Sequence, residues 1–167
     1  MKLRGLLLAA ALAAAPGVVS AEEPSGCGAF RWPLENERAA LNAARPSVSN
    51  GGELRYDTAL TLGLVPFAEA ALPQAPERAP KAAPSFAGHY TLSAPARPGV
   101  YKVTLASEGW VDVIDNGAFL HPKAFSGAVG CQGARKSVKF ALPGRPVVVQ
   151  VSNVKDAAIG AMITPAE

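Results

Sequence analysis

The clearest structural information in this chain lies in the stretch Trp110-Val111-Asp112-Val113-Ile114-Asp115-Asn116-Gly117. Its first five residues include three β-branched side chains and a tryptophan, which are typical of a strand. An Asn-Gly pair after such an apolar run is the strongest short-range indication of a hairpin turn. The stretch therefore predicts a strand that closes in a tight turn.

Segments that resemble strands surround this stretch on both sides. Apolar side chains alternate with others, or β-branched residues accumulate, in residues 86–93, 101–105, 137–142, 147–152 and 159–163. Turn residues separate these segments about every 8–12 residues, a spacing found in β-sandwiches and barrels. The sequence therefore predicts a mainly β fold, an antiparallel β-sandwich.

Two further segments precede these strands. Residues 54–64 show the same alternation, so we expect one more strand there, ended by Pro66. Residues 73–84 hold four prolines among alanine and charged residues. This composition buries little apolar surface and indicates an extended, solvated loop. Because either side alone is too small for a comfortable core, we interpret it as a loop within one domain.

One short N-terminal helix is expected in residues 30–44. Pro33 suits the first turn of a helix, where the missing N–H group costs nothing. The apolar positions give this helix only a weak apolar face. We expect it to lie across the end of a sheet, with Phe30 and Trp32 as its anchors.

Three runs of the sequence carry a resemblance to known proteins: Gly99-Val100-Tyr101-Lys102-Val103-Thr104-Leu105, Trp110-Val111-Asp112-Val113 and Val148-Val149-Gln150-Val151-Ser152. They resemble the C-terminal part of small, uncharacterised exported proteins of Gram-negative bacteria. More loosely, they are similar to β-sandwiches of the pre-peptidase C-terminal type. The resemblance covers residues 86–163 and implies a jelly-roll-like sandwich with a non-catalytic accessory role. It carries over no functional residue.

The first 21 residues have the features of a cleavable secretion signal. Two cations precede an uncharged apolar stretch of about 11 residues, and small residues follow. This stretch is short for a bilayer span, which needs about 20 residues. The alternatives are an uncleaved anchor and lipidation at Cys27, but Pro24 does not fit a lipoprotein signal. We therefore expect a signal peptide at 1–21, a single periplasmic or secreted domain at 22–167, and no later transmembrane segment.

The charge balance limits the kinds of partner. The formal net charge of +3 falls to +1 once Lys2 and Arg4 leave with the signal peptide. A nearly neutral domain has no overall field to attract nucleic acid, so no nucleic-acid partner is expected. Any partner must be recognised by local features of the surface, and the oligomeric state is not predicted.

Two cysteines, Cys27 and Cys131, remain after the signal peptide. An even number of cysteines in an oxidising compartment favours a disulfide, which here closes a loop of roughly 100 residues. Two free buried thiols are the alternative. The chain has no Cys-x-x-Cys motif, which disfavours a redox-active pair.

The sequence contains no recognisable catalytic motif such as G-x-S-x-G, H-E-x-x-H or a glycine-rich phosphate loop. His89 and His121 are the only histidines, so a small hydrolase that uses one of them is the enzymatic alternative. We expect no cofactor and no metal. Asp112, Asp115 and Asn116 lack the spacing of an EF-hand loop, and turn geometry explains the last two.

Trp110, Asp112 and His121 form the densest polar group beside an aromatic residue. Alternation places Trp110 and Asp112 on one face of their strand, and Val111 and Val113 on the other. If the valines face the core, Trp110 can stack on a sugar ring while Asp112 accepts hydrogen bonds from its hydroxyls. The alternative, favoured by the usual burial of tryptophan, places Trp110 in the core and makes Asp112 a loop cap.

A basic cluster is formed by Arg135, Lys136, Lys139 and Arg145. If Val138 faces inward, Lys139 points to solvent, where such charges usually protect an edge strand from aggregation. The functional alternative is contact of this cluster with an acidic polysaccharide or with lipid head groups.

The sequence favours a binding function over a catalytic one. The leading hypothesis is a non-catalytic binding or accessory module for an envelope glycan or protein. Its candidate contact residues are Trp110, Asp112, His121, Arg135 and Lys139. A small hydrolase and a purely structural envelope protein remain as alternatives.

Overall fold

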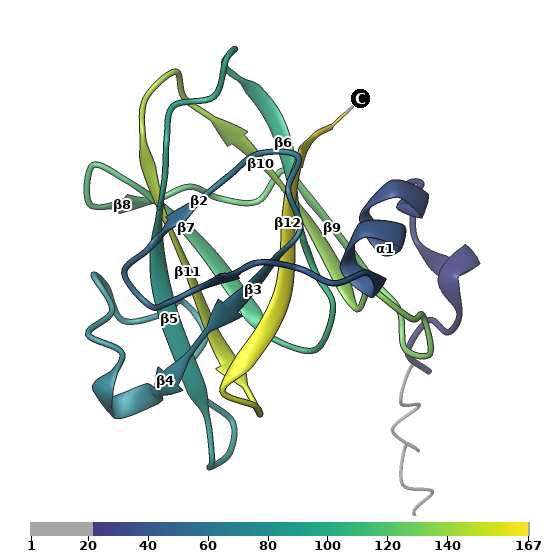
Figure 1. The fold of residues 1–167 in the computed structure, drawn as a ribbon, viewed down its shortest axis with the longest axis horizontal. Coiled ribbons are helices and arrows are strands. Elements are labelled where there is room, and N and C mark those ends of the chain that lie inside the picture. Colours follow the sequence, from purple (N-terminus) through teal and green to yellow (C-terminus); the bar gives the residue numbers. More distant parts are fainter. Residues whose placement is uncertain (1–21, 167) are drawn as a thin grey trace, which may run out of the picture.

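The molecule is built from two β-sheets that face each other (Figure 1). The computed structural model describes residues 22–166. The predicted signal peptide, residues 1–21, lies outside the described residues. Within residues 22–166 the inner faces of both sheets contribute to one apolar core, which confirms the predicted β-sandwich.

The first sheet has the strand order β1-β3-β12-β6-β10-β9. Its strands are β1 (Ser47–Val48), β3 (Leu60–Gly63), β12 (Ala158–Pro165), β6 (Gly99–Leu105), β10 (Lys136–Leu142) and β9 (Ala124–Gly127). The long strands pair antiparallel, whereas the short strand β1 runs parallel to β3.

The second sheet has the order β2-β5-β11-β7-β8, and β4 pairs with β5 beside this path. Its strands are β2 (Glu53–Leu54), β4 (Val65–Pro66), β5 (Phe86–Leu92), β11 (Val147–Val154), β7 (Trp110–Asp115) and β8 (Ala118–Phe119). The central pairs are antiparallel, and β2 runs parallel to β5 at the edge.

The hairpin predicted from the Asn-Gly pair is confirmed. Ile114 pairs with Phe119, and Asn116 and Gly117 have φ angles of 48° and 79°. Two successive positive φ angles match a type I′ turn, for which Asn-Gly is the preferred sequence.

Alternation along the strands divides the side chains between the core and two outer faces. Val111 and Val113 of β7 belong to the same apolar core as Val138 and Phe140 of β10. The residues between them in sequence, such as Asp112, therefore lie on the outer faces. Other segments of the chain cover both of these faces and bury the polar side chains there.

The single strand predicted for residues 54–64 is wrong. Leu54 lies in β2 of the second sheet, whereas Leu60 lies in β3 of the first sheet. Between them Asp57 has a φ angle of 53°, which turns the chain from one sheet to the other. The alternating leucines still face one core, but they reach it from opposite sides.

The N-terminal helix is shorter than predicted and lies elsewhere. α1 spans Glu35–Asn42, and a 3-10 turn, η1, spans Cys27–Ala29. The helix begins late because Phe30 is extended and Trp32 Nε1 donates to Ser137 Oγ of the first sheet at 3.1 Å. α1 packs beside β12 on the outer face of that sheet, not across its end (Figure 1). No helix in residues 22–166 is long and apolar enough to cross a membrane.

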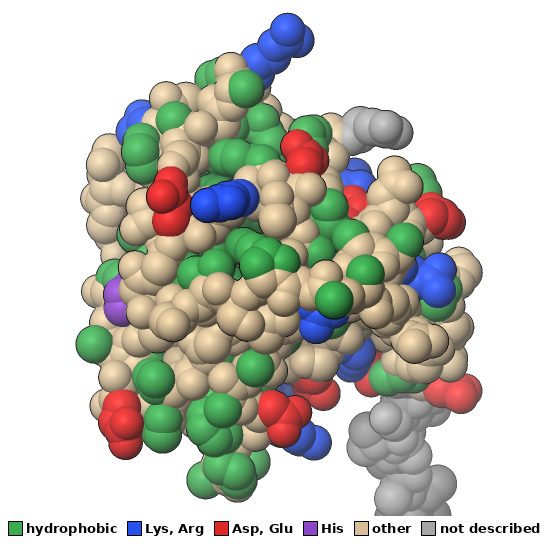
Figure 2. Space-filling model, in the orientation of Figure 1, with side chains coloured by type: hydrophobic (Ala, Val, Ile, Leu, Met, Phe, Trp, Pro, Cys, Tyr) green, Lys and Arg blue, Asp and Glu red, His purple; other side chains and the backbone are tan. Residues whose placement is uncertain are grey.

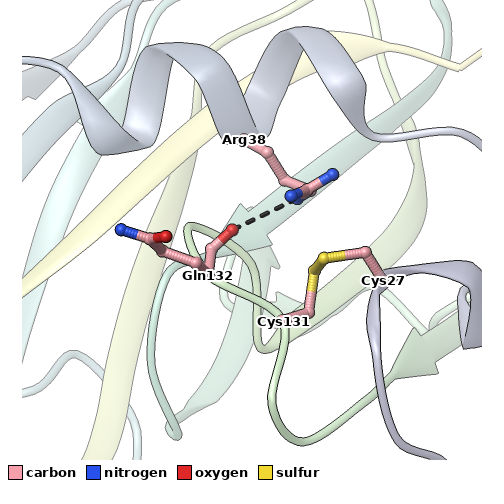
Figure 3. The surroundings of a disulfide bond; sticks show 4 residues. All are labelled: Cys27, Arg38, Cys131 and Gln132. Carbon is pink, nitrogen blue, oxygen red and sulfur yellow. Dashed lines mark hydrogen bonds between the residues drawn. A yellow bond between two sulfur atoms is a disulfide. The ribbon is translucent and has the colours of Figure 1, made fainter.

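The predicted disulfide is confirmed between Cys27 and Cys131 (Figure 3). Next to it, Arg38 Nε of α1 donates a hydrogen bond to the main-chain oxygen of Gln132 at 3.1 Å. The disulfide joins the start of the described chain to the loop before β10. It therefore fixes the whole N-terminal segment onto the first sheet.

Candidate functional site

Two adjoining cavities lie beside the start of β7. The smaller has a volume of about 300 Å³ and the larger a volume of about 680 Å³. The two cavities form one depression because five residues line both of them: Arg78, Lys81, Glu108, Trp110 and Lys136. We refer to this depression as the basic groove.

Both sheets contribute to the wall of the basic groove. Trp110 begins β7 in the second sheet, and Lys136 begins β10 in the first sheet. Lys136 Nζ donates a hydrogen bond to the main-chain oxygen of Gly109 at 2.8 Å, which links the two sheets at this point. The groove therefore lies at a margin of the sandwich that both sheets share.

The proline-rich loop of residues 73–84 also lines the groove. Asn153 of β11 holds this loop in two ways. Its Nδ2 donates to the oxygen of Arg78 at 2.8 Å, and its Oδ1 accepts from the N–H of Lys81 at 3.2 Å. The two cations of the loop are thereby brought to the groove, although they lie far from β7 and β10 in sequence.

Trp110 lies on the outer face of its sheet and is half-buried, so the prediction that it belongs to the core is wrong. The guanidinium carbon of Arg78 lies 5.4 Å from the centre of its ring, and Lys136 Nζ lies 5.2 Å from it. Both distances suit cation–π attraction. Trp110 therefore positions two cations, and its ring is not a free platform for a sugar.

Asp112 lies behind Trp110 and is buried, with 2 % of its surface exposed. It accepts hydrogen bonds from Trp110 Nε1 at 2.6 Å, Gln150 Nε2 at 3.2 Å and the N–H of Glu77 at 3.3 Å. The last contact is the loop cap that one reading of the sequence predicted. Asp112 thus holds Trp110 and the loop in place and is not accessible to a ligand.

The lining of the basic groove has an excess of positive charge. Among the described residues that line it, six are cations: Arg31, Arg78, Lys81, Arg135, Lys136 and Lys155. Two are carboxylates, Glu23 and Glu108, and Glu23 forms an ion pair with Arg135. This local excess contrasts with the nearly neutral charge predicted for the exported domain.

The surroundings of Lys136 disfavour the charged form of its side chain. Burial of its side chain lowers the pKa of Lys136, and the charges of Arg78 and Arg135 lower it further. Both effects disfavour the charged ammonium. A negatively charged group in the groove would relieve the repulsion among these cations.

Phe125 of β9 stands at the rim of the larger cavity. Its side chain is 67 % exposed, which is unusual for a large apolar residue in a strand. An exposed aromatic ring beside several cations offers an apolar surface to a ligand that carries both apolar and acidic groups.

The structure separates the other predicted contact residues. Arg135 lines the groove, but Lys139 lies on the outer face of the first sheet, with Nζ 4.4 Å from the ring centre of Trp32. β9 pairs outside β10, so the prediction that Lys139 protects an edge strand is wrong. His121 is exposed and does not belong to the lining of either cavity.

Two further predicted features also lie away from the groove. Arg145 Nε donates to Asp115 Oδ1 at 2.7 Å, which pairs the fourth member of the basic cluster at the surface. Nδ1 of His89 lies 3.3 Å from the main-chain oxygen of Ala70, and His89 is half-buried. Neither residue lines the cavities described above.

Sequence reasoning missed most of the basic groove. Arg78 and Lys81 stand in a segment whose composition indicates a solvated loop, and nothing in that composition shows where the loop lies. Phe125 is the one large apolar residue in β9, so no alternation marked this strand. The charge of Arg78 and Lys81 in an alanine- and proline-rich run was the available indication.

No family model matches the chain, and no match is found among curated proteins or solved structures. The resemblance to sandwiches of the pre-peptidase type therefore stays a prediction. Any function must be argued from the groove itself.

Proposed function

We propose that the protein is a non-catalytic module that binds an acidic glycan of the cell envelope in the basic groove. The observation that carries this proposal is the gathering of six cations around one concave site in a domain whose predicted net charge is only +1. On the face shown in Figure 2, by contrast, acidic side chains lie among the basic ones.

Electrostatics supports an anionic ligand. Burial lowers the pKa of Lys136, the charges of Arg78 and Arg135 lower it further, and the charge of Glu108 acts in the opposite direction. The cations of the groove therefore repel one another, and an anionic ligand would reduce this repulsion. A carboxylate placed among these groups accepts charge-assisted hydrogen bonds, which are about twice as strong as neutral ones. The gain is largest where the cations are partly shielded from water, as Lys136 is.

The aromatic groups support a sugar rather than a small inorganic anion. Phe125 presents an exposed ring at the rim of the larger cavity. Sugar rings have an apolar face that packs on aromatic side chains while their polar groups reach neighbouring donors. The larger cavity, at about 680 Å³, falls in the size range of sites for small organic ligands.

The disulfide supports a location outside the cytoplasm. Disulfides form and persist in the periplasm and outside the cell, and are rare in the reducing cytosol. A module that is exported there meets the acidic polysaccharides of the envelope.

The test is calorimetric titration with short oligogalacturonate, with a neutral oligogalactose of the same length as the ligand control. Lys136→Gln removes a cation from the groove, and Lys139→Gln removes one from the same strand outside it. We expect the wild type to bind the acidic oligomer and not the neutral one. Lys136→Gln should weaken binding about tenfold, as for the loss of one charge-assisted hydrogen bond.

Three results would contradict the proposal. The first is no binding of the acidic oligomer, and the second is an equal loss of affinity in Lys136→Gln and Lys139→Gln. The third is binding to phosphatidylglycerol vesicles without binding to the glycan, which would assign the groove to lipid head groups. Thermal unfolding of both variants controls for a loss of folded protein.

A further inference from the structure

Two carboxylates line the basic groove, Glu23 and Glu108, and among the described residues only Glu23 forms an ion pair there. Glu23 Oε1 forms an ion pair with Arg135 Nη2, and both residues line the larger cavity. We propose that Glu23 is an internal stand-in for the acidic group of the ligand, which holds Arg135 until a ligand displaces it. This inference rests on the proposed function and specifies how the same site is regulated.

The segment that carries Glu23 is tethered close to the groove. The N–H of Gly26 donates to the oxygen of Val129 at 2.8 Å, and the N–H of Val129 donates to the oxygen of Pro24 at 2.9 Å. The Cys27–Cys131 disulfide follows directly. A carboxylate one residue from such an anchor has a high effective concentration at Arg135 and returns readily after displacement.

The two partners of this ion pair differ in how firmly they are held. The side chain of Arg135 is 19 % exposed, whereas that of Glu23 is 54 % exposed. The guanidinium is therefore part of the wall, and the carboxylate is the group that can leave. Ion pairs of this exposure are weak, so a ligand can replace the carboxylate.

Because Glu23 pairs with a cation of the larger cavity, the two ends of the groove differ in how many of their cations are free to bind a ligand. Arg135 lines the larger cavity only, while Arg78 and Lys136 line both cavities and have no ion pair within residues 22–166. A ligand can engage Arg78 and Lys136 first and compete for Arg135 only through a second acidic group. The internal carboxylate thereby favours ligands with several acidic groups over those with one.

The chain offers a matched control for this proposal. Glu22 precedes Glu23 and has the same charge, but it forms no ion pair among the described residues and does not line the cavities. In protein produced with one extra residue before position 22, which prevents cyclisation of an N-terminal glutamine, Glu22→Gln and Glu23→Gln change the net charge equally. A difference between the two variants reports the contact with Arg135 and not the overall charge.

The first experiment measures affinity for oligogalacturonate in the disulfide-bonded protein. We expect Glu23→Gln to bind about threefold more tightly than the wild type, as for the release of one exposed ion pair, and Glu22→Gln to bind nearly as the wild type does. In an Arg135→Gln background the two glutamate variants should bind equally. Equal affinities of Glu22→Gln and Glu23→Gln in the otherwise wild-type protein would overturn the stand-in role.

The second experiment needs no glycan and separates the two proposals. Phenylglyoxal modifies accessible arginines, and mass spectrometry gives the rate at Arg135. We expect a faster rate in Glu23→Gln than in Glu22→Gln or the wild type. Equal rates in all three proteins would overturn the stand-in role even if the glycan binds. A faster rate in Glu23→Gln without any glycan binding would instead overturn the proposed function, and with it the role of Glu23 as a substitute for ligand.

Discussion

The two outer faces of the sandwich are both covered, but by different kinds of segment. The N-terminal segment with α1 covers the first sheet and is joined to it by the Cys27–Cys131 disulfide. The 73–84 loop covers part of the second sheet and contains no cysteine, so no disulfide fixes it there. We call the N-terminal segment of residues 22–42 the first cover and the 73–84 loop the second cover. The basic groove lies beside the second cover, where the loop meets β7.

The polar side chains under the first cover are paired with one another. Ser137 Oγ accepts hydrogen bonds from Trp32 Nε1 and from Thr104 Oγ1, each at 3.1 Å. Nearby, Glu37 Oε1 lies 2.7 Å from Lys102 Nζ and accepts a hydrogen bond from Thr164 Oγ1 at 2.6 Å. Buried polar groups that are fully paired hold a cover in one position.

The polar side chains under the second cover are paired less completely. Gln150 Nε2 donates to Asp112 and to the oxygen of Gln74, both at 3.2 Å. Gln150 Oε1 and Ser152 Oγ are also buried, and neither has a hydrogen-bond partner among the described residues. The first cover is therefore held by buried polar groups that are paired, whereas the second cover, which borders the basic groove, lies over polar atoms that are paired less completely.

Removal of the disulfide should have the largest effect and should loosen only the first cover. The bond spans 104 residues in sequence, and loss of such a link costs about 3–4 kcal/mol of unfolding free energy. In the Cys27→Ser/Cys131→Ser variant, urea titration should show this loss. Hydrogen exchange should rise in residues 22–42 and stay unchanged in residues 73–84. Equal loosening of both segments would contradict the distinction between the two covers.

Loss of Lys102, the half-buried cation that pairs with Glu37 of α1, should have the next largest effect. Lys102→Met leaves Glu37 buried without its ion-pair partner, which should cost about 3 kcal/mol in urea unfolding. The double variant Glu37→Gln/Lys102→Met removes the unpaired charge and should recover most of the loss. A cost below about 1 kcal/mol for Lys102→Met would show that the pair is no stronger than a surface contact.

The same ion pair should make the stability of the fold sensitive to acid. Burial alone would raise the pKa of Glu37, but the hydrogen bonds from Lys102 and Thr164 outweigh it and hold the pKa below its ordinary value of 4.5. A lowered pKa in the folded state stabilises the fold above pH 4.5, and this contribution is lost as the pH falls through the folded pKa. Thermal unfolding of Glu37→Gln should therefore depend less on pH in this range. If the melting temperature of Glu37→Gln depended on pH as that of the wild type does, Glu37 would not be the source of the acid sensitivity.

A serine-to-alanine substitution can be made on both outer faces. It should have the smallest effect on stability and gives the most closely matched comparison of the two covers. Ser137 and Ser152 are both buried, yet only Ser137 has hydrogen-bond partners within residues 22–166. Ser137→Ala leaves two donors unpaired and should cost about 1–2 kcal/mol, whereas Ser152→Ala should change stability by less than about 0.5 kcal/mol. Equal costs in urea unfolding would mean that the second cover is as well paired as the first.

Elements governed by local pattern could be predicted from the sequence. β7 and its turn follow from the β-branched run and Asn116-Gly117, and β10 and β11 follow from alternation. The single strand expected for residues 54–64 is wrong because alternation indicates which side chains face a core, but not from which sheet. A single residue with positive φ, Asp57, divides the strand between the two sheets.

The candidate site could be predicted only in part, because it depends on contacts between distant segments. Trp110 and Arg135 stand out locally as an aromatic residue and a cation near strand ends. Arg78 reaches the groove only because Asn153, 75 residues further along the chain, binds the loop. Contacts of this range leave no periodic mark on the sequence.

The chain contains two tryptophans, one on each outer face, and their indole N–H groups allow a direct test of where a ligand binds. The indole of Trp110 lies in the basic groove, and that of Trp32 lies under the first cover. Titration of ¹⁵N-labelled protein with oligogalacturonate should shift the indole resonance of Trp110 and leave that of Trp32 unchanged. A shift of the Trp32 resonance alone, or of neither, would contradict ligand binding in the basic groove.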